Sequence, residues 1–335
     1  MKKILLAFFS VFLLSCTQQN EKLQAIEGLA FGTTYHIQYY GSAPEEIQKG
    51  VDSVIDAINQ SASTYIKNSD ISRINNGDST VVVDAFFKEV FKLSDRIHKE
   101  SQGFFDPTVG VLRNAYGFGE ENPLMNLDTQ TLDSLMKFVG FHKVRLNDNG
   151  TIFKESPEIY IDFNAIAKGA GVDYVGKYLD SKDLTDYLIE IGGEILAKGQ
   201  NKNKNSKWTV GIEKPDSELT DRSYEAAIQL ENQALAASGN YRKFRVDETT
   251  GKKYVHTINP LTGSAEMSDV TSATVVAKTC AEADAYATAL MAMGFEKAKK
   301  LLSENNKIDA YLTYLNEDGT QQVYMTNGFR NLLVK

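Results

Sequence analysis

The hydrophobic and polar positions of this chain follow two periods, one typical of helices and one typical of strands. Apolar residues recur three or four positions apart in three segments, residues 47–58, 84–99 and 129–139. In the first of them, Val51 and Ile55 lie one helical turn apart on the apolar stripe. This spacing predicts three amphipathic helices.

Segments rich in β-branched and aromatic residues predict strands. The first is TTYHIQYY at residues 33–40, which a turn follows. The others are KVRLN (143–147), EIYIDF (158–163), DYLIEI (186–191), KWTVGIE (207–213), AAIQL (226–230), SATVVA (272–277), AYLTYL (310–315) and QQVYM (321–325). Helices cluster early and strands late, so the pattern predicts an α+β fold with a mixed, largely antiparallel β core flanked by helices.

The N-terminus reads MKKILLAFFSVFLLSC, which is two lysines, an apolar run and a small residue before a cysteine. This pattern predicts a signal peptide over residues 1–15. Its ending, LLSC, resembles the lipobox of bacterial lipoproteins, so Cys16 is expected to be lipidated; the alternative is a plain signal peptide with an incidental cysteine. We expect a lipid anchor and tether at residues 16–27, a folded domain at 28–335, and a location on a membrane facing the periplasm or cell exterior.

The composition limits the function classes. At 335 residues and 42% hydrophobic content, the chain can bury a substantial core. Its net charge is −8 and it has no basic tract, which argues against nucleic acid as a partner. With Cys16 lipidated, Cys280 has no cysteine left to pair with, so no intrachain disulfide is expected.

The stretch GVDYVGKY satisfies the spacing of a nucleotide-binding P-loop but has Tyr178 where that loop needs Ser or Thr. Val172, Val175 and Leu179 fall at helical spacing. The stretch is therefore predicted to be the body of a helix.

Just upstream, the segment YIDFNAIAKG is expected to turn sharply from a strand into a helix. Asp162 and Lys168 would then flank a small pocket near a helix N-terminus, where anions bind favourably. The alternative is that Asp162 caps the helix and Lys168 points into solvent.

A second segment, CAEADAYATALMAMG, is alanine-rich and helical. Asp284 and Thr288 are four residues apart, so their oxygens share one face of the helix. Two hard oxygen ligands of this kind suit Mg²⁺, although such a pair is more often an ordinary polar face.

Two further segments carry candidate groups. In YVHTINPLTG, His256 could transfer a proton or donate to phosphate, whereas a structural role is the alternative. In GFFDPTVG, Phe104 and Phe105 precede a turn at Asp106, and their rings could flank a flat ligand. Core packing with Asp106 as a turn former is the competing interpretation.

Taken in order, these segments resemble one family, the FAD:protein FMN transferases or ApbE family. The resemblance also rests on FGTTYHI (31–37), STY (63–65), EIGGEI (190–195) and ASGNY (237–241), and it covers nearly the whole mature chain. It implies an ApbE-like, T-fold-like α+β fold with FAD in a central cleft. Members attach the FMN half of FAD to a threonine or serine of a target protein through a phosphoester bond and release AMP.

The resemblance also implies a site. Mg²⁺ would be held by the side chains of Asp284 and Thr288 and by the backbone carbonyl of Ala165. His256 and Asp284 would be catalytic, the first stabilising phosphate or assisting proton transfer and the second doubling as a base. The FAD contacts would be Phe31, Tyr65, Phe104, Phe105, Asp106, Asp162, Lys168, Ser238, Gly239, His256 and Ile258. Phe31 departs from the methionine usual in the family.

Three function classes use such a pocket. The first is a flavin transferase acting on a membrane or exported redox subunit. The second is an Mg²⁺-dependent FAD pyrophosphatase, in which water replaces the target hydroxyl. The third is a non-catalytic FAD-binding lipoprotein, against which the presence of Asp284, Thr288 and His256 argues, since storage needs no metal at the pyrophosphate.

Overall fold

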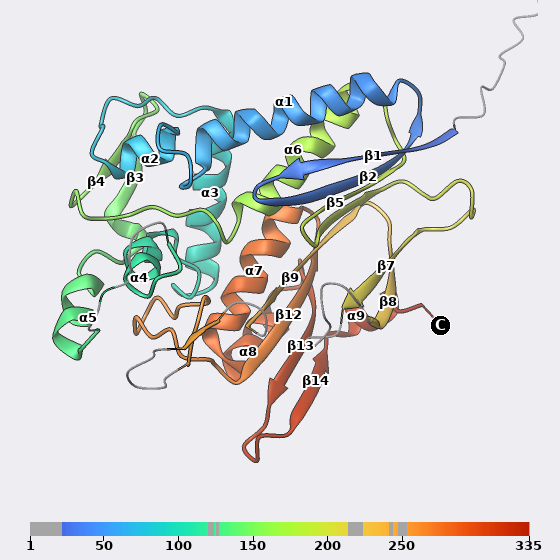
Figure 1. Ribbon diagram of the computed structural model, residues 1–335. Coiled ribbons are helices and arrows are strands. Elements are labelled where there is room, and N and C mark those ends of the chain that lie inside the picture. The colour runs from blue at the N-terminus through green and yellow to red at the C-terminus, as the bar shows by residue number, and fades with distance from the viewer. Residues whose placement is uncertain are drawn as a thin grey trace, which may run out of the picture.

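The computed structural model describes residues 22–119, 124, 127–213, 224–240, 244–246 and 253–334 (Figure 1). The predicted signal peptide and Cys16 lie outside these residues. Within them, no helix combines the length and the apolar composition that crossing a membrane requires.

An eight-stranded sheet forms the centre of the molecule, and every neighbouring pair of its strands is antiparallel. In spatial order the strands are β1 (Lys22–Ala30), β2 (Thr33–Gly41), β5 (Tyr187–Ile191), β6 (Glu194–Lys198), β9 (Gln233–Gly239), β12 (Val270–Ala277), β13 (Asp309–Leu315) and β14 (Gln321–Met325). The predicted antiparallel core is confirmed.

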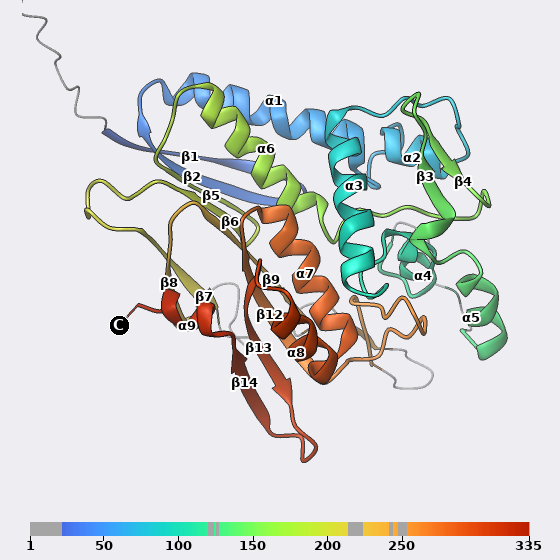
Figure 2. The same ribbon diagram turned by 180° about the vertical axis from the view of Figure 1, so that it is seen from behind.

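Different elements cover the two faces of this sheet (Figures 1 and 2). Strand residues alternate between the faces, so Ile37 and Tyr39 pack under the helices while Tyr40 packs against Trp208 on the opposite side. The helical layer contains α1 (Pro44–Ala62), α6 (Ala167–Ser181), α7 (Cys280–Met293) and α8 (Phe295–Glu304), with α3 (Ala85–Glu100) packed on α7. The other cover contains β7 (Trp208–Glu213), β8 (Tyr224–Leu230) and α9 (Asn327–Leu332).

The remaining short elements lie mostly to one side of the helical layer (Figure 1). Two of them carry Asn75 and Pro107, which hydrogen-bond to the segment before α6. The short elements are α2 (Asp70–Asn75), η1 (Pro107–Val109), α4 (Gly110–Ala115), α5 (Thr129–Met136), η2 (Phe141–Lys143), β3 (Val144–Leu146), β4 (Ile152–Lys154), β10 (Phe244–Val246) and β11 (Lys253–Val255).

The three helices predicted from periodicity are present as α1, α3 and α5, and the stretch that resembles a P-loop lies within α6, as predicted. The strand predicted at residues 158–163 is wrong. Its backbone is held by other partners, because the Asn75 side chain donates to Ile161 O and accepts from Ile161 N, both at 2.8 Å. Asp162 N donates to Pro107 O, also at 2.8 Å.

The boundary predicted between tether and domain is also wrong. Strand β1 begins at Lys22, so residues 22–27 belong to the sheet rather than to a tether. β1 is an edge strand in which only Ile26 and Ala30 are buried. Its sequence, KLQAIEGLA, therefore shows no clear alternation of apolar and polar residues, and its pairing with β2 is what makes it a strand.

Candidate functional site

The N-terminus of α6 packs directly against α7, and this contact joins two of the predicted segments. A Cβ atom on Gly169 would lie 2.7 Å from the carbonyl carbon of Cys280 and 2.9 Å from the nitrogen of Ala281. Only glycine permits this approach. The Gly169 N–H, free of an intrahelical partner in the first turn, donates to Asp284 Oδ2 at 3.0 Å. Asp284 is only 8% exposed.

Lys168 and Glu194 form an ion pair beside this contact. Lys168 Nζ lies 2.5 Å from Glu194 Oε2 and also donates to Gly192 O at 3.3 Å. Glu194 follows a two-glycine turn, Gly192 and Gly193, with φ values of 58° and 100°. The sequence did not single out Glu194, although this residue lies in the motif EIGGEI. The available signal was a charged residue directly after a Gly-Gly turn.

The cluster formed by Lys168, Glu194 and Asp284, here called the charge cluster, has two buried carboxyl groups and one ammonium. Burial raises the pKa of Glu194 to about 8, although Lys168 opposes this shift. Burial likewise raises the pKa of Asp284, against the effect of Lys168. Burial disfavours the Lys168 ammonium, but the two carboxylates outweigh it and raise its pKa. Ionising both carboxyls beside one ammonium would give a net charge of −1, which burial disfavours unless a further cation binds there.

Glu194→Gln is expected to weaken the pH dependence of stability. Glu194 has its ordinary pKa of 4.5 in the unfolded chain and about 8 in the folded one. Its contribution to the free energy of unfolding is therefore full below the first value and lost as pH rises through the second. We expect the free energy of unfolding, measured with urea between about pH 5 and about pH 9, to fall less in the variant than in the wild type. If the free energy of unfolding changed with pH in the same way in both proteins, the raised pKa of Glu194 would be refuted.

The oxygens near the charge cluster have the chemistry of a hard-cation site. Thr288 lies one turn after Asp284 on α7 and is partly buried, and Ala165 lies in the turn before α6. A carboxylate, a hydroxyl and a backbone carbonyl match the ligand preference of Mg²⁺, which keeps several waters. Among the described residues, no group of three or more His, Cys, Asp or Glu side chains could hold a metal ion. That part of the chain therefore has no metal site built mainly from histidine or cysteine.

Asp173 of α6 fixes the start of α7 from outside that helix. Its two carboxylate oxygens accept from Cys280 N at 2.8 Å and from Ala281 N at 2.9 Å. These amides have no intrahelical partners, and α7 carries Asp284 one turn further on.

Asp173→Ala is therefore expected to lower the free energy of unfolding by about 1–2 kcal/mol, the usual effect of losing a helix cap. Asp173→Asn keeps one acceptor oxygen, so we expect a smaller loss. Urea denaturation followed by circular dichroism measures both. Equal stability of the alanine variant and the wild type would refute the capping role.

A second group of contacts surrounds Asp162. Arg113 Nη1 donates to Asp162 Oδ2 at 2.8 Å, and Arg113 Nη2 donates to Tyr65 Oη at 2.5 Å. Asp162 and Tyr65 were predicted FAD contacts, and the structure brings them together through Arg113, which sequence reasoning missed. Arg113 gave no local signal, because its partners lie 49 and 48 residues away.

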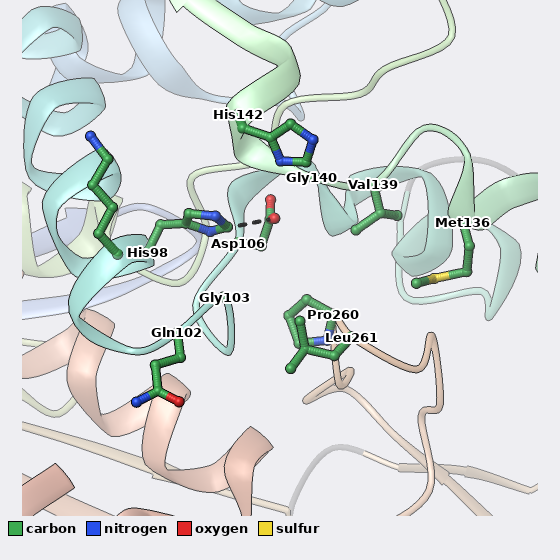
Figure 3. Close-up of a pocket in the computed structure, with 11 residues that line it drawn as sticks. His98, Gln102, Gly103, Asp106, Met136, Val139, Gly140, His142, Pro260 and Leu261 are labelled. Carbon is green, nitrogen blue, oxygen red and sulfur yellow. Dashed lines mark ion pairs between the residues drawn. The ribbon is translucent and has the colours of Figure 1, made fainter.

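Asp106 lines a cavity of about 430 Å³ (Figure 3). Its carboxylate accepts from Thr108 N, Thr108 Oγ1 and Phe141 N at 2.6–2.9 Å, and His98 Nδ1 lies 3.5 Å away. These bonds support the turn-forming interpretation of Asp106. In the described part of the chain, the other lining residues are His98, Lys99, Gln102, Gly103, Met136, Val139, Gly140, His142, Pro260 and Leu261.

Phe104 and Phe105 are 7% and 2% exposed and belong to the main core. This burial favours the core-packing interpretation of their rings. Their contact with FAD stays a prediction.

Phe31 occupies a strained position in the β1–β2 turn. Its φ of 51° is unusual for a bulky residue, and its ring fills the space that a Cβ on Gly171 would need, with Phe31 Cε2 2.5 Å from that position. The turn therefore places an aromatic ring on α6, three residues after Lys168 in the chain. Such strain often marks a functional position.

The other predicted contacts lie on three further segments. Ser238 and Gly239 end β9, opposite Ala273 and Ser272 of β12, and Ser238 is on the sheet face that α7 covers. His256 follows β11 and is partly buried. Their roles stay predictions, as does that of Ile258, which is buried with Leu112.

The sequence profile of the ApbE family matches residues 31–312. The chain belongs to the ApbE family. Two similar proteins are the FAD:protein FMN transferases of Vibrio cholerae, 35% identical with 100% of both chains covered, and of Haemophilus influenzae, 34% identical with 95% of both covered. These relatives confirm the resemblance inferred from the motifs.

Solved ApbE structures share the fold. The flavin transferase ApbE from Vibrio cholerae superposes with a TM-score of 0.81 at 33% identity, covering 93% of this chain and 100% of the other. The ApbE protein of Thermotoga maritima, at 24% identity, also gives a TM-score of 0.81 over 94% of this chain and 100% of the other. The predicted α+β, ApbE-like fold is therefore confirmed.

Proposed function

We propose that this ApbE-family protein transfers the FMN half of FAD to a threonine or serine hydroxyl of an exported or membrane redox protein and releases AMP. The full-length similarity to FAD:protein FMN transferases supports this activity. The observation that carries it in the structure is the charge cluster at the start of α6. It is a buried arrangement of two carboxyl groups and one ammonium beside a helix N-terminus.

Mg²⁺ is the proposed cofactor. Asp284, Thr288 and the carbonyl of Ala165 would hold it, since they supply hard oxygens and a cation there would favour ionisation of the buried carboxyls. When bound, the ion would neutralise charge on the FAD pyrophosphate.

The protein's own groups would then position and activate the reactants. Lys168 binds pyrophosphate oxygens at the N-terminus of α6, where the helix dipole favours anions. The acceptor hydroxyl forms a bond to the phosphorus nearer riboflavin, and the bond from that phosphorus to the AMP oxygen breaks. Asp284 or His256 takes the hydroxyl proton, and the AMP phosphate leaves with the bonding electron pair. Tyr65 and Asp162 contact the flavin end.

The proposed location follows from the N-terminal pattern. A signal peptide at residues 1–15 and lipidation of Cys16 would anchor the protein to a membrane, facing the periplasm or cell exterior. Mass spectrometry of Cys16 from the native membrane tests this part by itself. An unmodified cysteine retained behind an uncleaved leader would reject it.

The activity is tested with the full chain in detergent, FAD and Mg²⁺, with and without an exported flavoprotein subunit from the same cell. Fluorescent acceptor on a denaturing gel together with AMP is the expected result. AMP and free FMN without labelled acceptor would instead indicate a pyrophosphatase. FAD that is bound but unchanged would leave only a binding protein.

A further inference from the structure

A closed set of hydrogen bonds links the loop after α1 to the corner before α6. Arg113 donates to Tyr65 at 2.5 Å and to Asp162 at 2.8 Å. Asp162 Oδ1 accepts from Asn164 N at 2.7 Å, and Asn164 Nδ2 donates to Thr64 Oγ1 at 3.3 Å. Because Thr64 and Tyr65 are adjacent in the chain, the five residues form a closed ring, here called the polar ring.

The backbone around the polar ring is tightly packed. A Cβ atom on Gly110 would lie 2.7 Å from Tyr160 O and 3.2 Å from Asp162 Cβ, so the start of α4 presses against the corner segment. Asp162 N donates to Pro107 O at 2.8 Å. Arg113 lies one turn after Gly110 on α4. The close packing of α4 against the segment around Asp162 therefore fixes the position from which the Arg113 side chain bonds Asp162.

The charges in the polar ring depend on each other. The side chains of Arg113 and Asp162 are 14% and 4% exposed. Among the described residues, Arg113 is the only cation within 4.0 Å of Asp162. Removing the guanidinium would leave a buried carboxylate with only an amide donor, which is strongly unfavourable.

Tyr65 and Asn164 are the exposed members of the polar ring, and Tyr65 carries its aromatic group. Tyr65 is 57% exposed, and the guanidinium carbon of Arg113 lies 5.4 Å from the centroid of its aromatic ring. One face of this aromatic ring is thus covered by a cation, while the rest remains open to a flat ligand. Without Arg113 an exposed loop tyrosine would have several rotamers available, and fixing one of them on binding would weaken affinity.

We propose that Arg113 is a positioning residue for the flavin end of FAD. It holds Tyr65 and Asp162 in one arrangement before the ligand arrives, and it acts through these two side chains rather than on the reacting phosphate. The inference rests on the proposed function, because Tyr65 and Asp162 are assigned to the flavin there. A fork-shaped guanidinium is required, since a lysine ammonium can pair with Asp162 but cannot hold Tyr65 at the same time.

The test measures the FAD dissociation constant directly, by fluorescence titration with Mg²⁺ and without acceptor. Arg113→Met is expected to weaken FAD binding about tenfold to a hundredfold, the range for losing hydrogen bonds to a charged group. Arg113→Lys and Tyr65→Phe should each weaken it about fivefold or more. Because both remove the same contact, the double variant should be no weaker than Arg113→Lys alone.

Controls separate this positioning role from general destabilisation. Arg73→Met removes a nearby arginine that pairs with Asp78 at the surface, and it should leave FAD affinity unchanged. Arg113→Lys and Tyr65→Phe retain the charge or the ring and should keep a cooperative thermal unfolding transition. The KM for FAD should rise in both while kcat changes little.

Two results would overturn the inference. Wild-type affinity in Arg113→Lys and Tyr65→Phe would do so, and so would fully additive effects in the double variant. If the wild type itself bound no FAD, the proposed function would fail and take this inference with it, so the two failures are distinguishable.

Discussion

Asp284→Asn is expected to slow FMN transfer strongly while leaving the fold intact. The asparagine oxygen can still accept the Gly169 N–H that Asp284 accepts at 3.0 Å. The substitution removes the negative charge, and burial already raises the pKa of this carboxyl. An uncharged side chain is therefore expected to be at least as stable in this position. Losing a preorganised charged group at the phosphate should lower kcat by a factor of about 100–1,000.

Two measurements on Asp284→Asn separate its effects. Thermal unfolding should give a Tm equal to or above that of the wild type, and calorimetric titration should show weaker Mg²⁺ binding. Glu282→Gln is the matched control, because Glu282 lies on the same helix but pairs with Arg96 instead. Full transfer activity with unchanged Mg²⁺ affinity in Asp284→Asn would remove Asp284 from the site.

The sequence predicted well those elements whose apolar pattern matches their burial. The stripe of α1 is buried at Ile47, Val51 and Ile55 and faces the sheet, as its spacing predicts. α7 is buried on nearly all sides, which agrees with its alanine-rich composition. Periodicity succeeds here because burial of each element is decided by its own residues.

Failures occurred where distant residues decide the structure. The segment 158–163 has the composition of a strand, but the Asn75 side chain takes the hydrogen bonds of Ile161 from 86 residues away. Edge strand β1 has too few buried positions for a clear alternation.

The same limit applied to the candidate site. Motifs identified Lys168, Asp162 and Asp284 separately, but not the partners that neutralise or hold them. Glu194 meets Lys168, and Arg113 meets Asp162, only because the sheet and the helix-side loops bring these segments together. Pairings of this kind leave no period in the sequence, so they required the structure.

Gly169→Ala is expected to separate α6 from α7 and to lower both stability and activity. The added methyl would lie 2.7 Å from the Cys280 carbonyl carbon, and backbone atoms cannot rotate away as a side chain can. Such overpacking costs about 1–3 kcal/mol and outweighs the gain of about 1 kcal/mol that alanine brings to a helix. The shift would also lengthen the bond from Gly169 N to Asp284 and misalign Lys168.

Gly176→Ala on the same helix is the matched control for Gly169→Ala. Its Cβ would lie 2.7 Å from Leu196 Cδ2, 3.1 Å from Tyr187 Oη and 3.7 Å from Ile189 Cδ1, so it would meet side-chain ends rather than backbone. A displacement of about 1 Å at the charge cluster should reduce transfer roughly a hundredfold in Gly169→Ala, whereas Gly176→Ala should stay near wild type. Steady-state kinetics with urea unfolding measures both effects. If the two variants behaved alike, close packing at Gly169 would not be what positions Asp284.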